Sequence, residues 1–196
     1  RSTQSRSSAA SDVYKRQPSS SDISSGVELY QGHLGDQNWV TRVLAEVKPQ
    51  VIYHLAGVIK ADDAREYFRA NVLDSLSLFE AIAALMISPR VLVASSSAVY
   101  GAGWGSKVIS EVFKPRPLTH YALSKLALES LAFRYQRSHG IEVICTRTFN
   151  LIGPGQSRHL ACSQFAYQIA QAERTGGTNR IITGCLLYTS PSPRDS

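Results

Sequence analysis

The sequence predicts an α/β protein with a doubly wound parallel sheet, in which helices cover both faces of the sheet. Three observations lead to this fold class. Short apolar segments of strand length alternate along the chain with longer segments of helical periodicity. The apolar segments are almost continuously hydrophobic, which is typical of parallel strands buried on both faces. Glycine, proline or clustered serines separate the segments, as turns between elements require.

The first predicted elements follow a serine-rich loop. That loop covers residues 18–26, and residues 27–31 form a short strand candidate. Asp36 is placed to cap a helix over residues 37–47, because its carboxylate can accept hydrogen bonds from the first helical turn. Residues 51–55, with the sequence VIYHL, are predicted to form a buried strand.

A long helix is expected to begin at Asp62 or Asp63 and to continue to about Leu85, because apolar residues recur there near helical spacing. The remaining predicted elements are a strand over residues 90–94, a loop over residues 101–117, a helix over residues 119–139 that Gly140 ends, a strand over residues 141–148 and a helix over residues 163–174.

Composition excludes several classes of protein. Hydrophobic residues make up 43% of the chain and charged residues 18%, which favours a packed core over a wholly disordered chain. No apolar run approaches the roughly 20 residues that a membrane-spanning helix needs. Cys145 and Cys162 form no C-x-x-C pair, and the histidines lack metal-ligand spacing, so we expect neither a metal site nor a disulfide framework. These features favour a cytoplasmic protein with no membrane partner.

Both ends of the chain carry a signal at the level of the coding DNA. The sequences DVYKRQ (residues 12–17) and CLLYTS (residues 185–190) can be encoded by DNA strings that are reverse complements of each other. Such an inverted repeat resembles the transposon adapters used to fragment DNA for sequencing. We therefore expect residues 1–17 and 185–196 to be adapter-derived tails around a truncated native segment. Five of the 21 basic residues lie in these tails, so the net charge of +6 does not indicate a nucleic-acid partner.

Ligands of doubly wound sheets bind beyond the carboxyl ends of the strands, and the residues there carry the functional candidates. Ala56 and Gly57 follow the strand over residues 51–55, and small residues allow a flat ligand to approach the backbone. Three serines, residues 95–97, follow the strand over residues 90–94. Asn150 follows the last strand and carries an amide that can bind a ligand. Each of these features is also compatible with an ordinary turn.

Tyr121 and Lys125 lie four residues apart at the start of the predicted helix over residues 119–139, on one helical face. An ammonium group beside a phenol stabilises the phenolate, so such a tyrosine can exchange a proton with a sugar or alcohol oxygen near neutral pH. A solvated surface pair has the same spacing, so this pair taken alone leaves both interpretations open.

Together, and in this order, the motifs resemble the extended short-chain dehydrogenase/reductase family, which includes nucleotide-sugar epimerases, dehydratases and reductases. The resemblance covers about residues 27–184. It rests on VIYHLAG, the Asn71–Val72 pair, SSSAVYG, YALSK and RTFNLIGPGQ. Ser96 lies four residues before Tyr100 and 25 residues before Tyr121, which is typical of the family.

The resemblance implies a role for each strand-end residue. Tyr121 is the acid/base, Lys125 tunes it and holds the nicotinamide ribose, and Ser96 hydrogen-bonds the reacting sugar oxygen. The other implied contacts are Leu55, Ala56, Gly57, Asn71 and Phe149 on the dinucleotide side, with Asn71 ordering the site from its helix, and Asn150 on the nucleotide-sugar. The implied cofactor is NAD or NADP, which carries the hydride.

The resemblance also implies a domain organisation. Residues 18–155 would form an incomplete Rossmann-type dinucleotide-binding domain, and residues 156–184 would begin a substrate-binding lobe. The G-x-x-G-x-x-G turn of the family is absent from the sequence, and we expect it upstream with the first strand and helix. His33 stands where the family usually has an aspartate near the adenine. Ser97 and Ala98 stand where dehydratases carry an acidic residue, so elimination of water is poorly supported.

Within the family, GPGQS followed by SQFAYQIAQAE is most similar to reductases acting on GDP-4-keto-6-deoxymannose. A nucleotide-sugar 4-epimerase is the first alternative. A non-catalytic dinucleotide-sensing module or an inactive fragment is the alternative of another class, and the presence of Ser96, Tyr121 and Lys125 argues against a sensor. Family members often form homodimers through a helical interface, which here would include residues 119–139.

Overall fold

The computed structural model describes residues 27–102, 108–156, 158 and 160–176. The tails expected over residues 1–17 and 185–196, and the loop expected over residues 18–26, lie outside this part of the chain. The chain divides into two compact units, Arg1–Thr148 and Phe149–Ser196, and each is described by itself.

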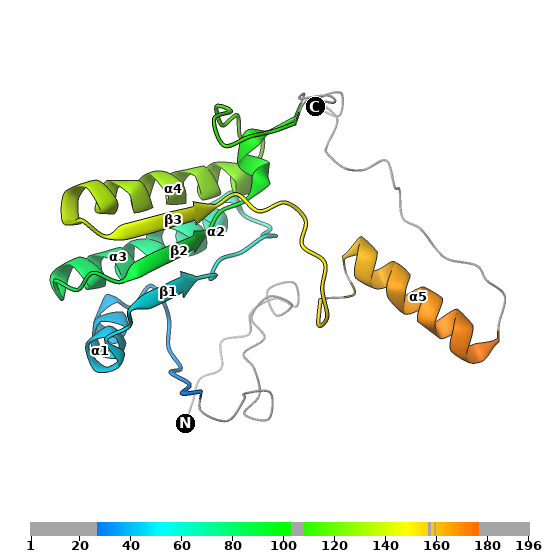
Figure 1. Ribbon diagram of the computed structural model, residues 1–196, viewed down its shortest axis with the longest axis horizontal. Coiled ribbons are helices and arrows are strands. Elements are labelled where there is room, and N and C mark those ends of the chain that lie inside the picture. Colours follow the sequence, from blue (N-terminus) through cyan, green and yellow to red (C-terminus); the bar gives the residue numbers. More distant parts are fainter. Residues whose placement is uncertain (1–26, 103–107, 157, 159, 177–196) are drawn as a thin grey trace. The chain divides into compact units, whose positions relative to one another are not determined.

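The first unit is built on a parallel sheet of three strands in the order β1-β2-β3 (Figure 1). These strands are β1 (Val51–His54), β2 (Arg90–Ala94) and β3 (Glu142–Thr146). His54 pairs with Val93, which in turn pairs with Cys145. Because all three strands are parallel, their carboxyl ends lie at the same edge of the sheet. The predicted parallel α/β architecture is confirmed.

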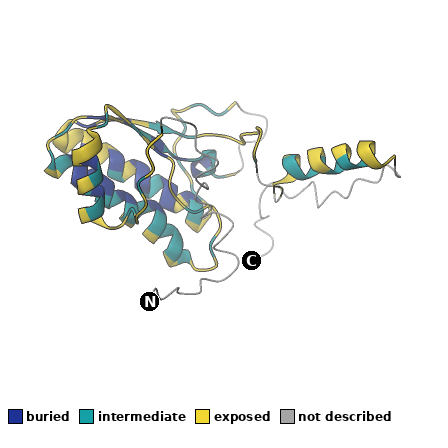
Figure 2. Ribbon diagram, turned by 90° about the horizontal axis from the view of Figure 1, so that it is seen from below, coloured by how far each residue is buried: buried dark blue, intermediate teal, exposed yellow. Residues whose placement is uncertain are grey.

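The core lies between the sheet and two helices, α3 (Asp74–Ala84) and α4 (His120–His139), which lie side by side (Figures 1 and 2). Val91 and Val93 of β2 are fully buried and pack with Phe79 of α3 and Leu128 of α4. The alternate strand residues Tyr53, Leu92 and Ile144 lie opposite one another, and Tyr53 and Ile144 are exposed. In the described residues, helices therefore cover one face of the sheet, whereas the sequence predicted helices on both faces.

Helix α1 (Gln37–Val47) packs on α3 and has the predicted bounds. Its cap is also as predicted, since Asp36 Oδ1 accepts a hydrogen bond from the Trp39 amide at 3.0 Å. Val40 and Leu44, one turn apart, are its buried residues. The apolar residues that recur at helical spacing in the sequence thus form the buried face of the helix.

The long helix expected after residue 62 or 63 forms as three consecutive segments. They are α2 (Ala64–Phe68), a π-helical turn η2 (Arg69–Leu73) and α3. Asp63 is the cap and accepts a hydrogen bond from the Arg65 amide at 2.9 Å. A π-helical turn is wider than an α-helical one, and such turns occur often at functional sites. Asn71, which is fully buried, lies in this turn.

The prediction of a strand over residues 27–31 is wrong, because this segment forms no strand. A strand needs a neighbour for its backbone hydrogen bonds, and no described segment pairs with these residues. Side chains attach the segment instead, since Tyr30 donates a hydrogen bond to Glu46 of α1 at 3.0 Å.

The later elements form close to their predicted bounds. Helix α4 begins after Thr119, whose side chain accepts a hydrogen bond from the Ala122 amide at 3.1 Å, and ends at Gly140. The predicted strand over residues 141–148 is shorter and ends at Thr146. In the second unit, α5 (Ala161–Thr175) is the predicted last helix.

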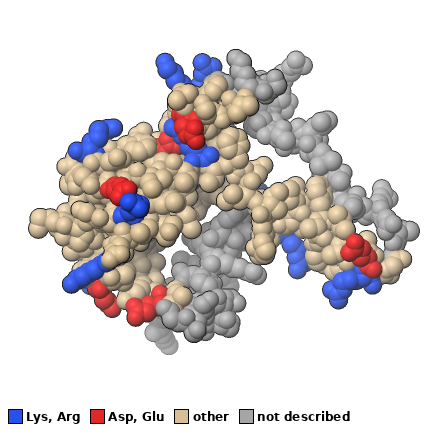
Figure 3. Space-filling view, viewed as in Figure 1, with Lys and Arg blue, Asp and Glu red and all other residues tan. Residues whose placement is uncertain are grey.

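The surface of the described residues carries charges of both signs. In the view of Figure 3, basic and acidic side chains are interspersed, and uncharged surface covers most of the described face. Among the described helices, none combines the length and the hydrophobicity that crossing a lipid bilayer requires.

Candidate active site at the strand ends

Backbone hydrogen bonds hold β2 and β3 together beyond their last residues. The Ser95 amide donates to the Thr146 carbonyl at 3.0 Å, and the Ser97 amide donates to the Thr148 carbonyl at 2.9 Å. The segment after β2 is therefore fixed to the end of β3. This is where Ser96 lies.

Ser96 precedes a short 3-10 helix, η3 (Ser97–Tyr100), which was not predicted from the sequence. The Ser96 backbone is extended, and its Oγ accepts a hydrogen bond from the Ala98 amide at 3.2 Å. A hydroxyl carries one donor besides its acceptor sites, so Ser96 can still donate to the oxygen of a ligand. Its side chain is half-buried at the carboxyl end of β2.

Tyr121 and Lys125 lie in the first two turns of α4, one turn apart on the same face. Lys125 is only 5% exposed, and its Nζ donates a hydrogen bond to the carbonyl of Ala94, the last residue of β2, at 3.0 Å. Burial lowers the pKa of Lys125 from its ordinary value. A surface pair is therefore excluded for this lysine, because its ammonium group is buried against the end of a strand.

The backbone at Gly57 approaches this lysine closely. Gly57 has φ of +150°, and a Cβ atom there would lie 2.5 Å from Asn71 Oδ1 and 3.2 Å from Lys125 Nζ. A side chain would collide with the first and crowd the second, so the position requires glycine. Gly57, Asn71 and Lys125, predicted separately from three motifs, are brought together here. Leu55 and Ala56, which precede Gly57, are exposed.

Asn71 joins the segment after β1 to the start of α4. Its Oδ1 accepts a hydrogen bond from the Val58 amide at 2.8 Å, and its Nδ2 donates to the Val58 carbonyl at 3.1 Å. The same Nδ2 donates to Ser124 Oγ at 2.9 Å, and Ser124 donates to the Tyr121 carbonyl at 2.7 Å. Asn71 thus contacts the segments that carry Gly57, Tyr121 and Lys125.

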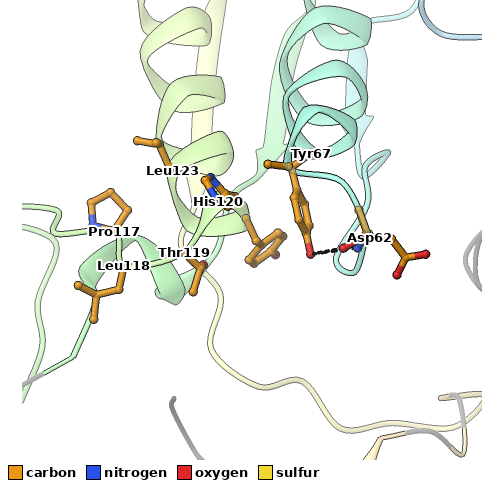
Figure 4. A pocket seen from close by; sticks show the side chains of 10 residues that line it. Asp62, Tyr67, Pro117, Leu118, Thr119, His120 and Leu123 are labelled. Atoms are coloured by element: carbon orange, nitrogen blue, oxygen red, sulfur yellow. Dashed lines mark hydrogen bonds between the residues drawn. The ribbon is translucent and has the colours of Figure 1, made fainter. Parts of the chain in front are cut away.

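A cavity of about 580 Å³ opens beside Tyr121 (Figure 4). The ring of Tyr67 from α2 meets the ring of Tyr121 edge-on, with centroids 6.2 Å apart. The Tyr67 hydroxyl accepts a hydrogen bond from the Ala61 amide at 3.0 Å. The lining residues come from α2 and the loop before it, and from the start of α4 and the loop before it: Ala61, Asp62, Ala64, Tyr67, Pro117, Leu118, Thr119, His120, Tyr121 and Leu123. A ligand in this cavity would have the Tyr121 side chain in its wall.

His54, the last residue of β1, is buried next to this cluster. Its Nε2 lies 2.7 Å from Ser75 Oγ, and Ser75 Oγ lies 3.0 Å from the Asn71 carbonyl. Burial, with a smaller effect of the Lys125 charge, lowers the pKa of His54 from 6.5 to about 4. The imidazole is therefore neutral at pH 7 and adds no second positive charge beside Lys125.

Two polar residues of the site, Glu129 and Arg147, were not predicted from the sequence, and Ser95 was named only as one of the three serines after the strand over residues 90–94. Ser95 Oγ donates to Glu129 Oε1 at 2.5 Å, and Arg147 Nη2 lies 2.8 Å from Glu129 Oε2. One signal could have found Glu129, because it continues the spacing of four that starts with Tyr121 and Lys125. No sequence signal marks Ser95 or Arg147 as its partner.

Phe149 and Asn150 begin the second unit, in which both are exposed. Their roles on the dinucleotide and the nucleotide-sugar remain predictions.

A parallel sheet with a buried lysine, a tyrosine and a close glycine at its strand ends has the features of Rossmann-type dinucleotide-dependent enzymes. The comparison with protein families is consistent with this class. The NAD dependent epimerase/dehydratase family matches residues 2–190, so the chain belongs to that family.

Two curated relatives show the range of activities among similar proteins. GDP-6-deoxy-D-mannose reductase of Pseudomonas aeruginosa is 35% identical over 141 residues, which are 69% of this chain and 46% of the relative. UDP-glucose 4-epimerase of Mycoplasma genitalium is 31% identical over 134 residues, which are 65% of this chain and 39% of the relative. The chain thus spans less than half the length of these relatives.

Solved structures agree with the fold. RMD from Pseudomonas aeruginosa, complexed with NADPH, matches 77% of this chain and 52% of its own, with 32% identity and a TM-score of 0.71. UDP-glucose 4-epimerase of Thermus thermophilus, complexed with NAD, matches 83% of this chain and 53% of its own, with 26% identity and a TM-score of 0.72. The predicted Rossmann-type fold and the resemblance to nucleotide-sugar enzymes are confirmed.

Proposed function

We propose that the whole protein is an NAD(P)-dependent nucleotide-sugar oxidoreductase, most similar in activity to a GDP-4-keto-6-deoxymannose reductase. It transfers a hydride at a sugar carbon, with Tyr121 as the acid/base. The observation that carries the proposal is the convergence of Gly57, Asn71 and the buried Lys125 at the strand ends, next to the helical turn of Tyr121.

Tyr121 would protonate the sugar oxygen as the carbonyl carbon receives the hydride. Lys125, one turn away on α4, would stabilise the phenolate that forms until solvent returns the proton, and would hold the nicotinamide ribose. Ser96 would donate a hydrogen bond to the same sugar oxygen from the end of β2. Asn150 would contact the nucleotide-sugar.

The residues after β1 fit a dinucleotide. Leu55 and Ala56 are exposed, and Gly57 presents backbone without a side chain beside Asn71 and Lys125. Leu55, Ala56, Gly57 and Phe149 would line NAD or NADP, while Asn71, Tyr121 and Lys125 would hold the ribose end. When bound, the dinucleotide supplies the hydride.

A second candidate activity is a nucleotide-sugar 4-epimerase, because a relative of that name is 31% identical to this chain. The reductase is preferred because the reductase relative is 35% identical and covers slightly more of this chain. The non-catalytic sensor is not favoured, since the named relatives are enzymes. The expected domain division (residues 18–155 for the dinucleotide, residues 156–184 for the start of a substrate lobe), the cytoplasmic location and the homodimer belong to the same proposal.

The test is the variant Tyr121→Phe in the full-length protein, with GDP-4-keto-6-deoxymannose as substrate and the oxidation of NADH or NADPH followed by absorbance. Loss of the phenolic proton should lower kcat by about 10²- to 10⁴-fold, with the dissociation constant of the cofactor nearly unchanged. The control is Tyr135→Phe, since Tyr135 lies in the same helix and its hydroxyl bonds Glu80 away from the site. Full turnover by Tyr121→Phe would overturn the proposal. Interconversion of UDP-glucose and UDP-galactose without net cofactor oxidation would favour the epimerase.

A further inference from the structure

A buried polar network joins α4 to the ends of β2 and β3. It consists of Ser95, Glu129 and Arg147, and we call it the Ser95–Glu129–Arg147 network. Ser95 Oγ donates to Glu129 Oε1 at 2.5 Å. Arg147 binds the same carboxylate with two nitrogens, Nε at 2.9 Å from Oε1 and Nη2 at 2.8 Å from Oε2. The Glu129 side chain is 3% exposed and that of Arg147 19%.

The network costs free energy that an apolar core would not. Removing a carboxylate and a guanidinium from water is unfavourable, and well-packed apolar residues often stabilise a fold equally well. The network instead supplies a fixed orientation, because a bidentate ion pair fixes both the distance and the angle between its partners. Arg147 also lies over the ring of Tyr100, 5.0 Å from its centroid, and Tyr100 ends the helix η3 that Ser96 caps.

The network adjoins the proposed catalytic residues, one helical turn after Lys125 on α4 and one residue before Ser96. Tyr121, Lys125 and Glu129 are spaced by four residues and share one face of α4. Ser95 precedes Ser96, and because the Ser96 backbone is extended, the two side chains point to opposite sides. The bond from Ser95 to Glu129 therefore sets the direction in which Ser96 points, relative to the helix that carries Tyr121.

We propose that Glu129 is a positioning residue, which acts through Ser95 and Arg147 to hold Ser96 at the correct place relative to Tyr121 and Lys125. The inference rests on the proposed function. Glu129 does not contact the substrate in this proposal. Its role is to align the ends of β2 and β3 with α4. A misplacement of about 1 Å lowers turnover by roughly 100-fold in enzymes that depend on alignment.

The structure offers a matched control. Arg90 and Glu142 form an ion pair between the same two strands at their other ends, with Arg90 Nε 2.7 Å from Glu142 Oε1. Both side chains are more than half exposed. Arg90→Met removes a β2–β3 ion pair far along the strands from Ser96, and it should leave kcat unchanged.

The experiment compares Glu129→Gln, Ser95→Ala and Arg90→Met in the full-length protein. We expect Glu129→Gln and Ser95→Ala to lower kcat by about 10- to 100-fold while the dissociation constant of the cofactor changes less than about 2-fold. Ser95→Ala keeps the Glu129–Arg147 ion pair, so it remains informative if Glu129→Gln does not fold. Wild-type kcat in folded Ser95→Ala protein, with only the melting temperature lowered, would overturn the inference.

A second measurement separates this inference from the proposed function. Amide hydrogen exchange of residues 95–101 reports whether the segment around Ser96 is held, whatever the protein catalyses. We expect faster exchange in Ser95→Ala and Glu129→Gln, and exchange as in the wild type in Arg90→Met. If the wild type shows no turnover of nucleotide-sugars, the proposed function fails, and the positioning inference fails with it for this reaction. If the wild type turns over and exchange is equal in all variants, only the positioning inference fails.

Discussion

The substitution Gly57→Ala tests the close approach of the Gly57 backbone to Asn71 and Lys125. The added Cβ would lie 2.5 Å from Asn71 Oδ1 and 3.2 Å from Lys125 Nζ, at φ of +150°. Backbone strain at such a φ costs about 1–3 kcal/mol for a residue other than glycine. If Asn71 moves away, its two bonds to Val58 are lost as well, at about 1 kcal/mol each. The full-length variant should therefore be less stable by about 3–5 kcal/mol.

The assay is denaturant unfolding combined with a titration of NADH and NADPH. The free energy of unfolding should fall by the amount above, and cofactor affinity should fall at least about tenfold, since the displaced groups would border the dinucleotide in the proposed site. Gly140→Ala is the control, because Gly140 also has a positive φ (+67°) but no atom within 4 Å of an added Cβ. Its cost should stay near about 1–2 kcal/mol, from strain alone, with cofactor binding unchanged. Equal costs and equal cofactor affinities for the two variants would refute the reasoning.

Two further predictions concern stability. The pKa of His54 is about 4 in the fold against 6.5 in the unfolded chain, so on acidification the unfolded chain binds the proton first. The free energy of unfolding is therefore unaffected by His54 above pH 6.5. It falls by about 1 kcal/mol per pH unit as the pH drops from 6.5 towards 4. Urea unfolding of the wild type and of His54→Gln between pH 7 and 4 checks this, and identical pH dependence would contradict it. Asp36→Ala removes the cap of α1 and should lower the free energy of unfolding by about 1 kcal/mol, whereas Asp62→Ala, at an exposed acidic residue one position before the Asp63 cap of α2, should change it little; equal effects would contradict the assignment of the cap.

Local signals in the sequence were sufficient for most elements. The helix over residues 37–47 was predicted with its bounds and its cap, because the apolar spacing and Asp36 act within a few residues of each other. The same holds for the strand over residues 90–94, whereas Thr119, expected as the first helical residue, is the cap of α4. The strand expected over residues 27–31 failed because a strand depends on a neighbour, and no property of a five-residue segment reveals whether one exists.

In the candidate site, too, local features were predicted from the sequence and contacts between distant segments were not. Tyr121 and Lys125 were found from their spacing, since four residues make one helical turn wherever the helix lies. The spacing does not reveal that Lys125 is buried, that it bonds the Ala94 carbonyl or that it lies near Gly57 and Asn71. These partners lie more than 30 residues away from Lys125 in the sequence. The π-helical turn that contains Asn71 was likewise hidden within an ordinary helical pattern.

The sequence by itself determined the order of strands and helices, the helix ends at Asp36 and Gly140, the family resemblance and the identity of the residues at the strand ends. These features depend on side-chain periodicity and on hydrogen bonds between near neighbours, both of which are written along the chain. Only the tertiary structure decided which face of the sheet is covered, that Gly57 lies against Asn71 and Lys125, and that Ser95, Glu129 and Arg147 form one network. Those features depend on where three parallel strands place residues from distant parts of the chain, and that placement is a property of packing rather than of local sequence.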